Sequence, residues 1–313
     1  MKTDSTSGVR ILSRKIRVNI LLILSLFLPG WHIHQSFAND AELLMSPEMV
    51  SAIPMDQRVI VDTRPSWKFL LSHVPGAINL SDWQEFTSTQ NGIKGLLRND
   101  KDFISKKLSP LGFSPEKTII VYGDPKDPWR TDGRFFWMFE HYGFNKVAIL
   151  NGGLTSWKNA GKKVQRGRQN PKPATGFTSK NIQLNNKVIA DKYMINNSFL
   201  SSGFSIIDNR TRREFDGDTP YGSPRGGHIP NAIHIHWPDF FQNDGSLKEL
   251  KDLNILLKKN DIKPDQEIIV YCTGGVRSAM AYFVFRYMGY KVRNYDGSWW
   301  DWSQSSFPVE AGS

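Results

Sequence analysis

Five short segments occur twice along this chain of 313 residues, in the same order and about 145 to 155 residues apart. The paired segments are 59–64 and 205–210, 73–79 and 228–234, 118–122 and 267–271, 142–144 and 288–290, and 151–153 and 296–298. Shared patterns include an apolar run that ends in Asp-x-Arg and a His-x-Pro-x-Ala turn. Chance seldom produces ordered matches at nearly one spacing, so the sequence predicts a duplicated domain.

Each half alternates short apolar, β-rich runs with segments of helical pattern, as in 118–122 and 267–271 and the residues after them. Strands that are buried on both faces and separated by helices are typical of a parallel α/β sheet. We therefore predict two tandem α/β domains, each an open, mostly parallel sheet flanked by helices. The expected boundaries are 42–164 for the first domain, 165–182 for a polar, Pro- and Gly-containing linker, and 183–304 for the second domain.

Residues 1–38 have the pattern of an export signal. A basic stretch ends at Arg17, an apolar stretch covers 18–28, and the small residues Ser36 and Ala38 fit a cleavage site. The apolar stretch has about eleven residues, fewer than the ~20 that a membrane-spanning helix needs. The segment predicts export to the periplasm. If the segment is not cleaved, we expect it to be the one part of the chain that contacts a membrane.

The formal charge of +10 falls to roughly +6 without residues 1–38, which contain five basic residues and one acidic residue. The remaining charge suits small anions, but it is spread along the chain. No run of Lys and Arg is interleaved with aromatic residues, so we do not expect a nucleic-acid partner.

Cys272 is the only cysteine of the chain, which excludes an internal disulfide. It follows the apolar run 268–271 and begins the segment Cys-Thr-Gly-Gly-Val-Arg, after which a helical pattern covers 279–287. Two glycines permit a tight loop whose backbone N–H groups turn inward, and the following helix presents its positive end. Such a cradle would lower the pKa of Cys272 and populate the nucleophilic thiolate.

Two interpretations of Cys272 compete at this point. A free cysteine is commonly a small buried residue of a core. Its expected place at the carboxyl end of a strand, the two glycines and the nearby permanent charge of Arg277 favour chemistry instead. We expect Arg277 either to face a ligand or to brace the loop.

The Cys272 loop, the Asp-x-Arg segments, His-Ile-Pro-Asn-Ala and Asp-Gly-Ser-Trp together resemble the tandem-domain rhodaneses, the thiosulfate and 3-mercaptopyruvate sulfurtransferases. The resemblance covers residues from about 42 to 304. It implies that Cys272 heads a catalytic loop, 272–277, takes a sulfane sulfur from a small anionic donor, holds it as a persulfide, and passes it to cyanide or a thiol. It implies neither a metal nor an organic cofactor.

Under this resemblance we expect the residues after Cys272 to bind the anionic sulfur and Arg225 to help attract the donor. The loop residues concerned are Thr273, Gly274, Gly275, Val276 and Arg277. Asp208 and Arg210 are expected to support the scaffold, and His73 and His228 to belong to matched turns. The tryptophans around the loop have open roles, in a pocket wall, a domain interface, an exposed loop or the core: Trp129, Trp299, Trp300 and Trp302.

The sequence departs from the family at three places. Gly123 stands where the second half has Cys272, so the first half is predicted to be non-catalytic. Glu214 stands where mercaptopyruvate-specific members have an arginine, and its charge would repel a donor carboxylate. The loop 272–277 matches neither the loop of thiosulfate-specific members nor that of mercaptopyruvate-specific members, so donor identity stays open, with thiosulfate preferred.

Four residues separate Cys272 from Arg277, one fewer than in phosphatases that use the same pair of residues. The smaller ring should favour sulfur over a tetrahedral phosphate, although phosphatase or arsenate reductase activity remains an alternative. We therefore predict a sulfurtransferase that moves sulfur from thiosulfate, or with less support 3-mercaptopyruvate, through a Cys272 persulfide. The alternative from another class is a partner-dependent sulfur carrier or a non-enzymatic binding module.

Overall fold

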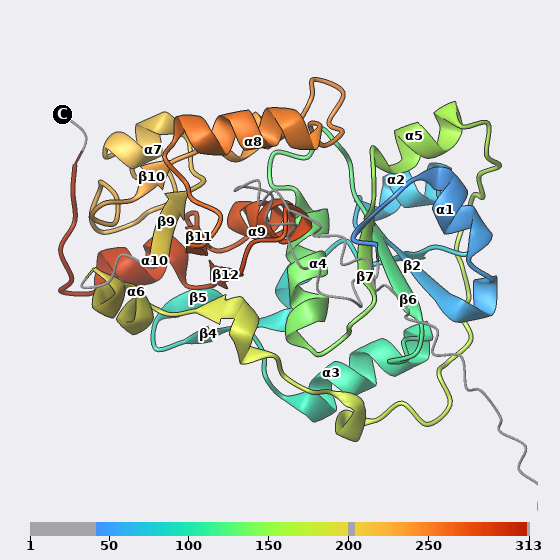
Figure 1. Ribbon diagram of the computed structural model, residues 1–313. Helices are drawn as coiled ribbons and strands as arrows, with labels where there is room; N and C mark the ends of the chain where they lie inside the picture. Colours follow the sequence, from blue (N-terminus) through green and yellow to red (C-terminus); the bar gives the residue numbers. More distant parts are fainter. Residues whose placement is uncertain (1–41, 200–203, 312–313) are drawn as a thin grey trace, which may run out of the picture. The chain divides into compact units, whose positions relative to one another are not determined.

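The computed structural model describes residues 42–199 and 204–311 (Figure 1). These residues belong to one compact unit that covers 39–313. The predicted export signal, 1–38, lies outside the described residues. In the part of the chain that is described, no helix combines the length and the apolar character that crossing a bilayer requires.

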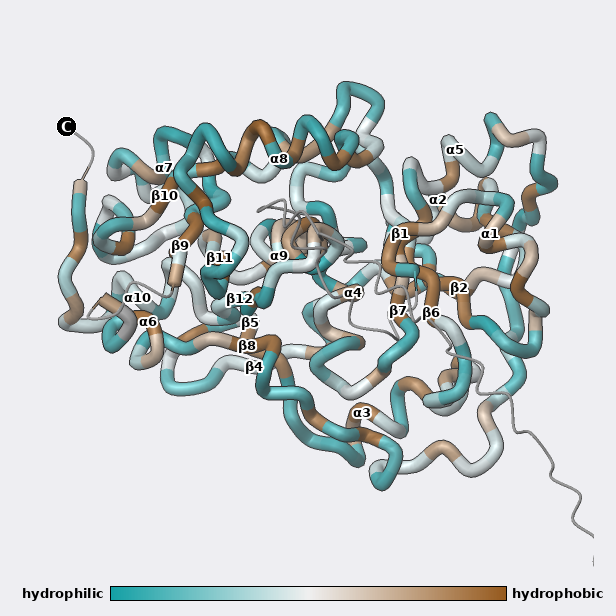
Figure 2. The backbone as a smooth tube through the Cα atoms, in the orientation of Figure 1, coloured by the Kyte–Doolittle hydropathy of each residue, from teal (hydrophilic) through white to brown (hydrophobic). Residues whose placement is uncertain are grey.

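The first half forms a five-stranded parallel sheet with the strand order β1-β7-β6-β2-β3. Its strands are β1 (Leu44–Met45), β2 (Arg58–Asp62), β3 (Ile78–Asn79), β6 (Thr118–Tyr122) and β7 (Val147–Leu150). One face is covered by α1 (Pro47–Ala52), α2 (Ser66–Leu71) and α5 (Gly153–Asn159), and the other by α3 (Lys101–Leu108) and α4 (Thr131–His141). Figure 2 shows hydrophobic residues along β1, β2 and β7, as strands that are covered on both faces require.

The second half repeats this arrangement, with the strand order β10-β9-β11-β12-β8 and parallel pairing throughout. Its strands are β8 (Ile189–Ala190), β9 (Phe204–Asp208), β10 (Ile233–His234), β11 (Glu267–Tyr271) and β12 (Val292–Tyr295). Its helices are α6 (Lys192–Ser198), α7 (Arg212–Asp216), α8 (Leu250–Lys259), α9 (Arg277–Tyr287) and α10 (Ser298–Gln304). The prediction of two α/β domains with parallel sheets flanked by helices is confirmed.

The two halves share one hydrophobic core, in which α4 packs against α9 (Figure 1). The backbones approach so closely that a Cβ added at Gly133 would lie 2.5 Å from the Cα of Met280. Phe136 and Phe283 meet edge to face across this contact, with 5.0 Å between ring centroids. Helix α9 is buried from Arg277 to Phe285, as expected of a helix that is apolar on every side.

A hairpin of the first half lies against the second half. It consists of β4 (Thr87–Gln90) and β5 (Ile93–Leu97), and β5 contacts α10. The backbone N–H of Leu97 donates to Oδ2 of Asp296 at 2.8 Å. The hairpin therefore places first-half residues beside the segment that follows β12.

The predicted linker, 165–182, is fully described and packs on the first half. It contains an isolated β-bridge between Gln165 and His73 and a short 3-10 turn at Ser179–Asn181. Phe177 and Ile182 are buried in the shared core. Low apolar periodicity in this segment therefore reflects irregular backbone, not an exposed tether.

Candidate active site

Cys272 lies directly after β11 and before α9, at the carboxyl edge of the second sheet. The two glycines of its loop are required by their surroundings. A Cβ at Gly274 would lie 2.2 Å from the Trp300 ring, and Gly275 has φ +76° with the Asp296 carbonyl oxygen 2.6 Å from an added Cβ. Any side chain at either position would force the loop to move.

The thiol of Cys272 is only 1% exposed, but it lines a cavity of about 460 Å³. Burial by itself would raise the pKa of the thiol. The positive charge of Arg277 and hydrogen bonds from the Ser278 hydroxyl and the backbone N–H groups of Ser278 and Gly274 oppose that effect, and the net pKa is lowered. The loop thus favours a thiolate at the floor of the cavity.

Arg277 braces the loop through a buried, two-pronged pair with Glu214 of α7. Its Nη1 donates to Glu214 Oε2 at 2.9 Å, and its Nη2 donates to Glu214 Oε1 and to Thr273 Oγ1, both at 2.7 Å. The Thr273 hydroxyl donates in turn to Glu214 Oε1 at 2.7 Å. One carboxylate therefore ties together the second and the last residues of the loop.

The capping residue of α7 fixes this carboxylate. Thr211 caps the helix, and Glu214 reaches back to its backbone N–H in a capping box. Burial alone would raise the pKa of Glu214, but hydrogen bonds from Arg277, Thr273 and Thr211 and the charge of Arg277 lower it to about 2. Glu214 is therefore ionised, and its negative charge is paired with Arg277.

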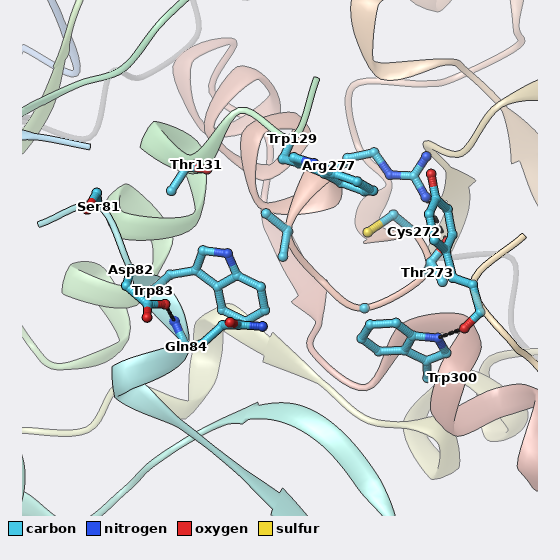
Figure 3. Close-up of a pocket in the computed structure, with 13 residues that line it drawn as sticks. Ser81, Asp82, Trp83, Gln84, Trp129, Thr131, Cys272, Thr273, Arg277 and Trp300 are labelled. Carbon is cyan, nitrogen blue, oxygen red and sulfur yellow. Dashed lines mark hydrogen bonds between the residues drawn. The ribbon is translucent and has the colours of Figure 1, made fainter. Parts of the chain in front are cut away.

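Both halves line the cavity (Figure 3). The first half contributes Ser81, Asp82, Trp83, Gln84, Trp129 and Thr131, and the second half contributes Tyr221, Cys272, Thr273, Gly274, Val276, Arg277 and Trp300. The Arg277 guanidinium lies 5.4 Å from the Trp129 ring centroid and 5.6 Å from that of Tyr221. These two rings, one from each half, meet edge to face at 5.5 Å.

The model of the family described as Rhodanese-like domain matches residues 46–160 and again 192–305. The chain belongs to the rhodanese family. A thiosulfate sulfurtransferase of Corynebacterium glutamicum is 29% identical, over 82% of this chain and 85% of that protein. The sulfur carrier protein TtuD of Thermus thermophilus is 28% identical, over 74% of this chain and 82% of that protein.

Among solved structures, YnjE superposes with a TM-score of 0.70 and 26% sequence identity. The match covers 88% of this rhodanese and 64% of the YnjE chain. Because named thiosulfate sulfurtransferases match most of its length, this rhodanese is a sulfurtransferase. The two family matches cover the two sheets described above except for their edge strands β1 and β8.

The structure brings most of the predicted loop residues of this rhodanese to the cavity. Cys272, Thr273, Gly274, Val276 and Arg277 line it. Gly275 is not a lining residue, because its carbonyl turns to the opposite side of the loop, where the Arg134 guanidinium and the Asn294 amide donate to it at 3.1 Å each.

Arg225, expected to help attract the donor, does not line the cavity. Its guanidinium donates to the backbone carbonyls of Ser303, Trp302 and Ser305 at 3.0, 3.1 and 2.7 Å. These carbonyls lie at the C-terminal end of α10, where a cation is electrostatically favoured. In this structure Arg225 holds a helix end, and its contact with a donor stays a prediction.

Asp208 and Arg210 form a buried pair behind the sheet edge. Arg210 Nη2 donates to Asp208 Oδ2 at 2.6 Å and to the Gly227 carbonyl at 2.7 Å. The first half repeats the arrangement with Asp62 and Arg64. Since neither half directs this pair into the cavity, the geometry is that of a scaffold.

The two matched histidines pack on phenylalanine rings, and the four tryptophans divide between the cavity wall and the core. His228 stacks on Phe215 at 3.6 Å, and His73 stacks on Phe69 at 3.9 Å, each with Nδ1 at the carbonyl of that same phenylalanine. Trp129 and Trp300 line the cavity, whereas Trp299 and Trp302 are buried in the core of the second half.

Trp83 and Arg134 are among the first-half residues that sequence reasoning missed. Arg134 is fully buried in α4 and crosses into the second half, where its Nη1 donates to Asp296 Oδ1 at 2.7 Å as well as to Gly275. The available signal was a charged residue at the start of the otherwise apolar run 134–139. Trp83 carries no motif, and only the fold brings it to the cavity.

The first-half counterpart of the Cys272 position leaves little room for a side chain. A Cβ added at Gly123 would lie 3.0 Å from the Asp132 carboxyl carbon and from Thr63 Oγ1. The neighbouring Asp124 pairs with Lys68 at 2.5 Å. This edge therefore holds an ion pair where the second half holds a thiol.

Proposed function

We propose that this rhodanese moves a sulfane sulfur from thiosulfate to a thiol or cyanide acceptor through a persulfide on Cys272. The observation that carries the proposal is the thiol at the floor of a two-sided cavity, with its pKa lowered by Arg277 and inward-facing N–H groups. A lowered pKa supplies the thiolate that attacks sulfur.

In the first step, the Cys272 thiolate attacks the outer sulfur of thiosulfate. A sulfur–sulfur bond forms on Cys272, the sulfur–sulfur bond of thiosulfate breaks, and sulfite leaves with the electron pair. The N–H groups of Gly274 and Ser278 face the sulfur and stabilise its negative charge before and after transfer.

In the second step, the acceptor attacks the outer sulfur of the persulfide, and the Cys272 thiolate leaves. A thiolate acceptor becomes a persulfide and cyanide becomes thiocyanate, so neither step needs an oxidant or a reductant. The pair of Arg277 and Glu214 keeps the loop in one geometry through both steps.

Thiosulfate is the preferred donor because the cavity has no unpaired arginine for a carboxylate. Of the lining residues, all in the described part of the chain, Arg277 is the one arginine, and Glu214 occupies both of its terminal nitrogens. A 3-mercaptopyruvate carboxylate would have to compete with Glu214 for this cation.

A partner-dependent sulfur carrier is the second candidate, favoured by the similarity to a sulfur carrier protein. The pattern of residues 1–38 supports a further proposal, that the chain is exported to the periplasm. The thiosulfate sulfurtransferase and the sulfur carrier would use the same thiol, so they differ in the source and the destination of the sulfur.

A donor panel tests the proposal, with purified protein that begins at Asn39, thiosulfate or 3-mercaptopyruvate as donor, and cyanide as acceptor. We expect turnover with thiosulfate, little with 3-mercaptopyruvate, and an intact-mass increase of one sulfur atom, about 32 Da, that Cys272→Ser abolishes. Absence of both the adduct and turnover would refute the proposal, and loading only from a protein persulfide would favour the carrier.

A further inference from the structure

The cavity above Cys272 is larger and more aromatic than inorganic substrates require. Its volume of about 460 Å³ falls within the ~300–1,000 Å³ typical of sites for organic ligands. Trp83 and Trp129 come from the first half, and Tyr221 and Trp300 from the second. Thiosulfate and cyanide would leave most of this aromatic wall uncovered.

Two of these rings are partly exposed to solvent. Trp129 is 40% exposed and Tyr221 is 39% exposed, although each packs one side on Arg277. Exposed aromatic surface that gathers around a concave site is typical of a binding surface. A ligand ring would remove this surface from water.

Trp83 and Trp300 lie on opposite sides of the cavity, one from each half (Figure 3). A Cβ placed at Gly95 would lie 3.6 Å from the Trp83 ring and 3.9 Å from the Trp300 ring. The Trp300 indole N–H donates to the Tyr221 carbonyl at 3.3 Å, which fixes the orientation of the ring. A planar group that enters between the halves would therefore meet one ring from each half.

The charges around the cavity disfavour an acceptor with a carboxylate. Besides the Cys272 sulfur, two described lining residues carry charge: Arg277, which is neutralised by Glu214, and Asp82, which is an exposed acid. Lys94 lies with its Nζ 4.2 Å from the Trp300 centroid, but it is not a lining residue. The wall around the Cys272 sulfur thus offers aromatic surface and the negative charge of Asp82.

We infer that the acceptor of the Cys272 persulfide is an uncharged organic thiol with a planar aromatic group, which binds against the four rings. This inference rests on the proposed function and specifies its second step. The acceptor thiolate attacks the outer sulfur, the sulfur–sulfur bond to Cys272 breaks, and the aromatic thiol leaves as a persulfide.

The test compares acceptors on protein that has already been loaded with sulfur from thiosulfate and checked by intact mass. The probes are 1-propanethiol, 2-phenylethanethiol and 3-mercaptopropionate, compared at equal thiolate concentration so that only the attached group differs. We expect the second-order rate constant for persulfide loss to be about 10-fold higher for 2-phenylethanethiol than for 1-propanethiol, as ring contacts of ordinary strength would give. 3-Mercaptopropionate should be no faster than 1-propanethiol.

Variants connect this preference to the wall. Trp129→Ala should bring the ratio of the first two rate constants towards one, Trp129→Phe should retain most of it, and Trp83→Leu should lower it independently. Trp67→Ala is the matched control, because Trp67 is 61% exposed on α2 and does not line the cavity, so the ratio should stay at the wild-type value.

Equal rate constants for the two uncharged thiols in the wild-type protein would overturn the inference. An unchanged ratio in both Trp129→Ala and Trp83→Leu would also overturn it. Failure to load sulfur would instead refute the proposed function, because loading precedes the comparison of acceptors.

Discussion

Replacement of Arg134 by methionine tests whether the half without a thiol holds the catalytic loop in place. Arg134 is fully buried, and its guanidinium donates to Asp296 at 2.7 Å, to the Gly275 carbonyl at 3.1 Å and to the Gly95 carbonyl at 2.9 Å. Methionine fills much of the same volume without a charge. Asp296 would then lose its cation, and the two carbonyls would lose a donor.

The expected cost follows from these contacts. Removing one partner of a buried ion pair typically costs ~3–5 kcal/mol, because the other charge stays buried. Asp296 keeps one hydrogen bond from the Leu97 N–H, which places the expected loss of unfolding free energy at the lower end, about 3 kcal/mol. Since Gly275 is part of the loop, misplacement should also slow sulfur transfer, by about 10- to 100-fold.

Urea unfolding followed by tryptophan fluorescence measures the first quantity, and the rate of thiosulfate-to-cyanide transfer measures the second. Arg212→Met is the matched control, because Arg212 forms an exposed pair with Asp216, and its loss should cost less than about 1 kcal/mol. Wild-type stability and wild-type transfer in Arg134→Met would refute the conclusion that the first half fixes the loop.

Three further results are expected. Glu214→Gln should lower the free energy of unfolding by about 2–3 kcal/mol at pH 7. Because the pKa of Glu214 is depressed to about 2, the difference in stability from wild type should shrink as the pH falls from about 4.5 towards 2. Urea unfolding at several pH values measures this difference. The rate of Cys272 alkylation should have its pH midpoint below the usual thiol pKa of 9.0, and Arg277→Met should raise that midpoint. Equal midpoints in the wild type and the variant would argue against the conclusion that the Arg277 guanidinium lowers the pKa of the thiol. Gly275→Ala should reduce both the stability and the rate of sulfur transfer. Gly92→Ala is the control: Gly92 has φ +81° and its nearest neighbour 3.7 Å from an added Cβ, so the substitution should cost about 1 kcal/mol of stability and leave the rate unchanged. Similar transfer rates in both variants would refute the conclusion that a side chain at Gly275 displaces the loop.

The repeat made the fold predictable, because each half carries its strand ends, turns and loop in local patterns. The same patterns located Cys272 and the loop residues next to it. Residues whose role depends on a distant partner were harder to interpret. The sequence predicts that the Glu214 charge faces a substrate, whereas its partner in the structure is Arg277, which lies 63 positions further along the chain.

Arg225 and Trp83 also show that local sequence does not determine which side chains reach the cavity. Arg225 occurs at a family-like position, but the carbonyls at the end of α10 determine where its guanidinium points. Trp83 has no motif and reaches the cavity only because the halves pack through α4 and α9. Side-chain direction and contacts between halves depend on tertiary packing, which local periodicity does not encode.

The contact between α4 and α9 bears on how this molecule can be divided. Helix α9 begins at the catalytic loop, and its residues from Arg277 to Phe285 are buried partly against the other half. A fragment that begins at residue 183 would present these apolar residues to water, and we expect it to aggregate or to lose loop geometry. The first half has no thiol at the matching position but forms the other side of the shared core, so we expect the two halves to fold and to be expressed only together.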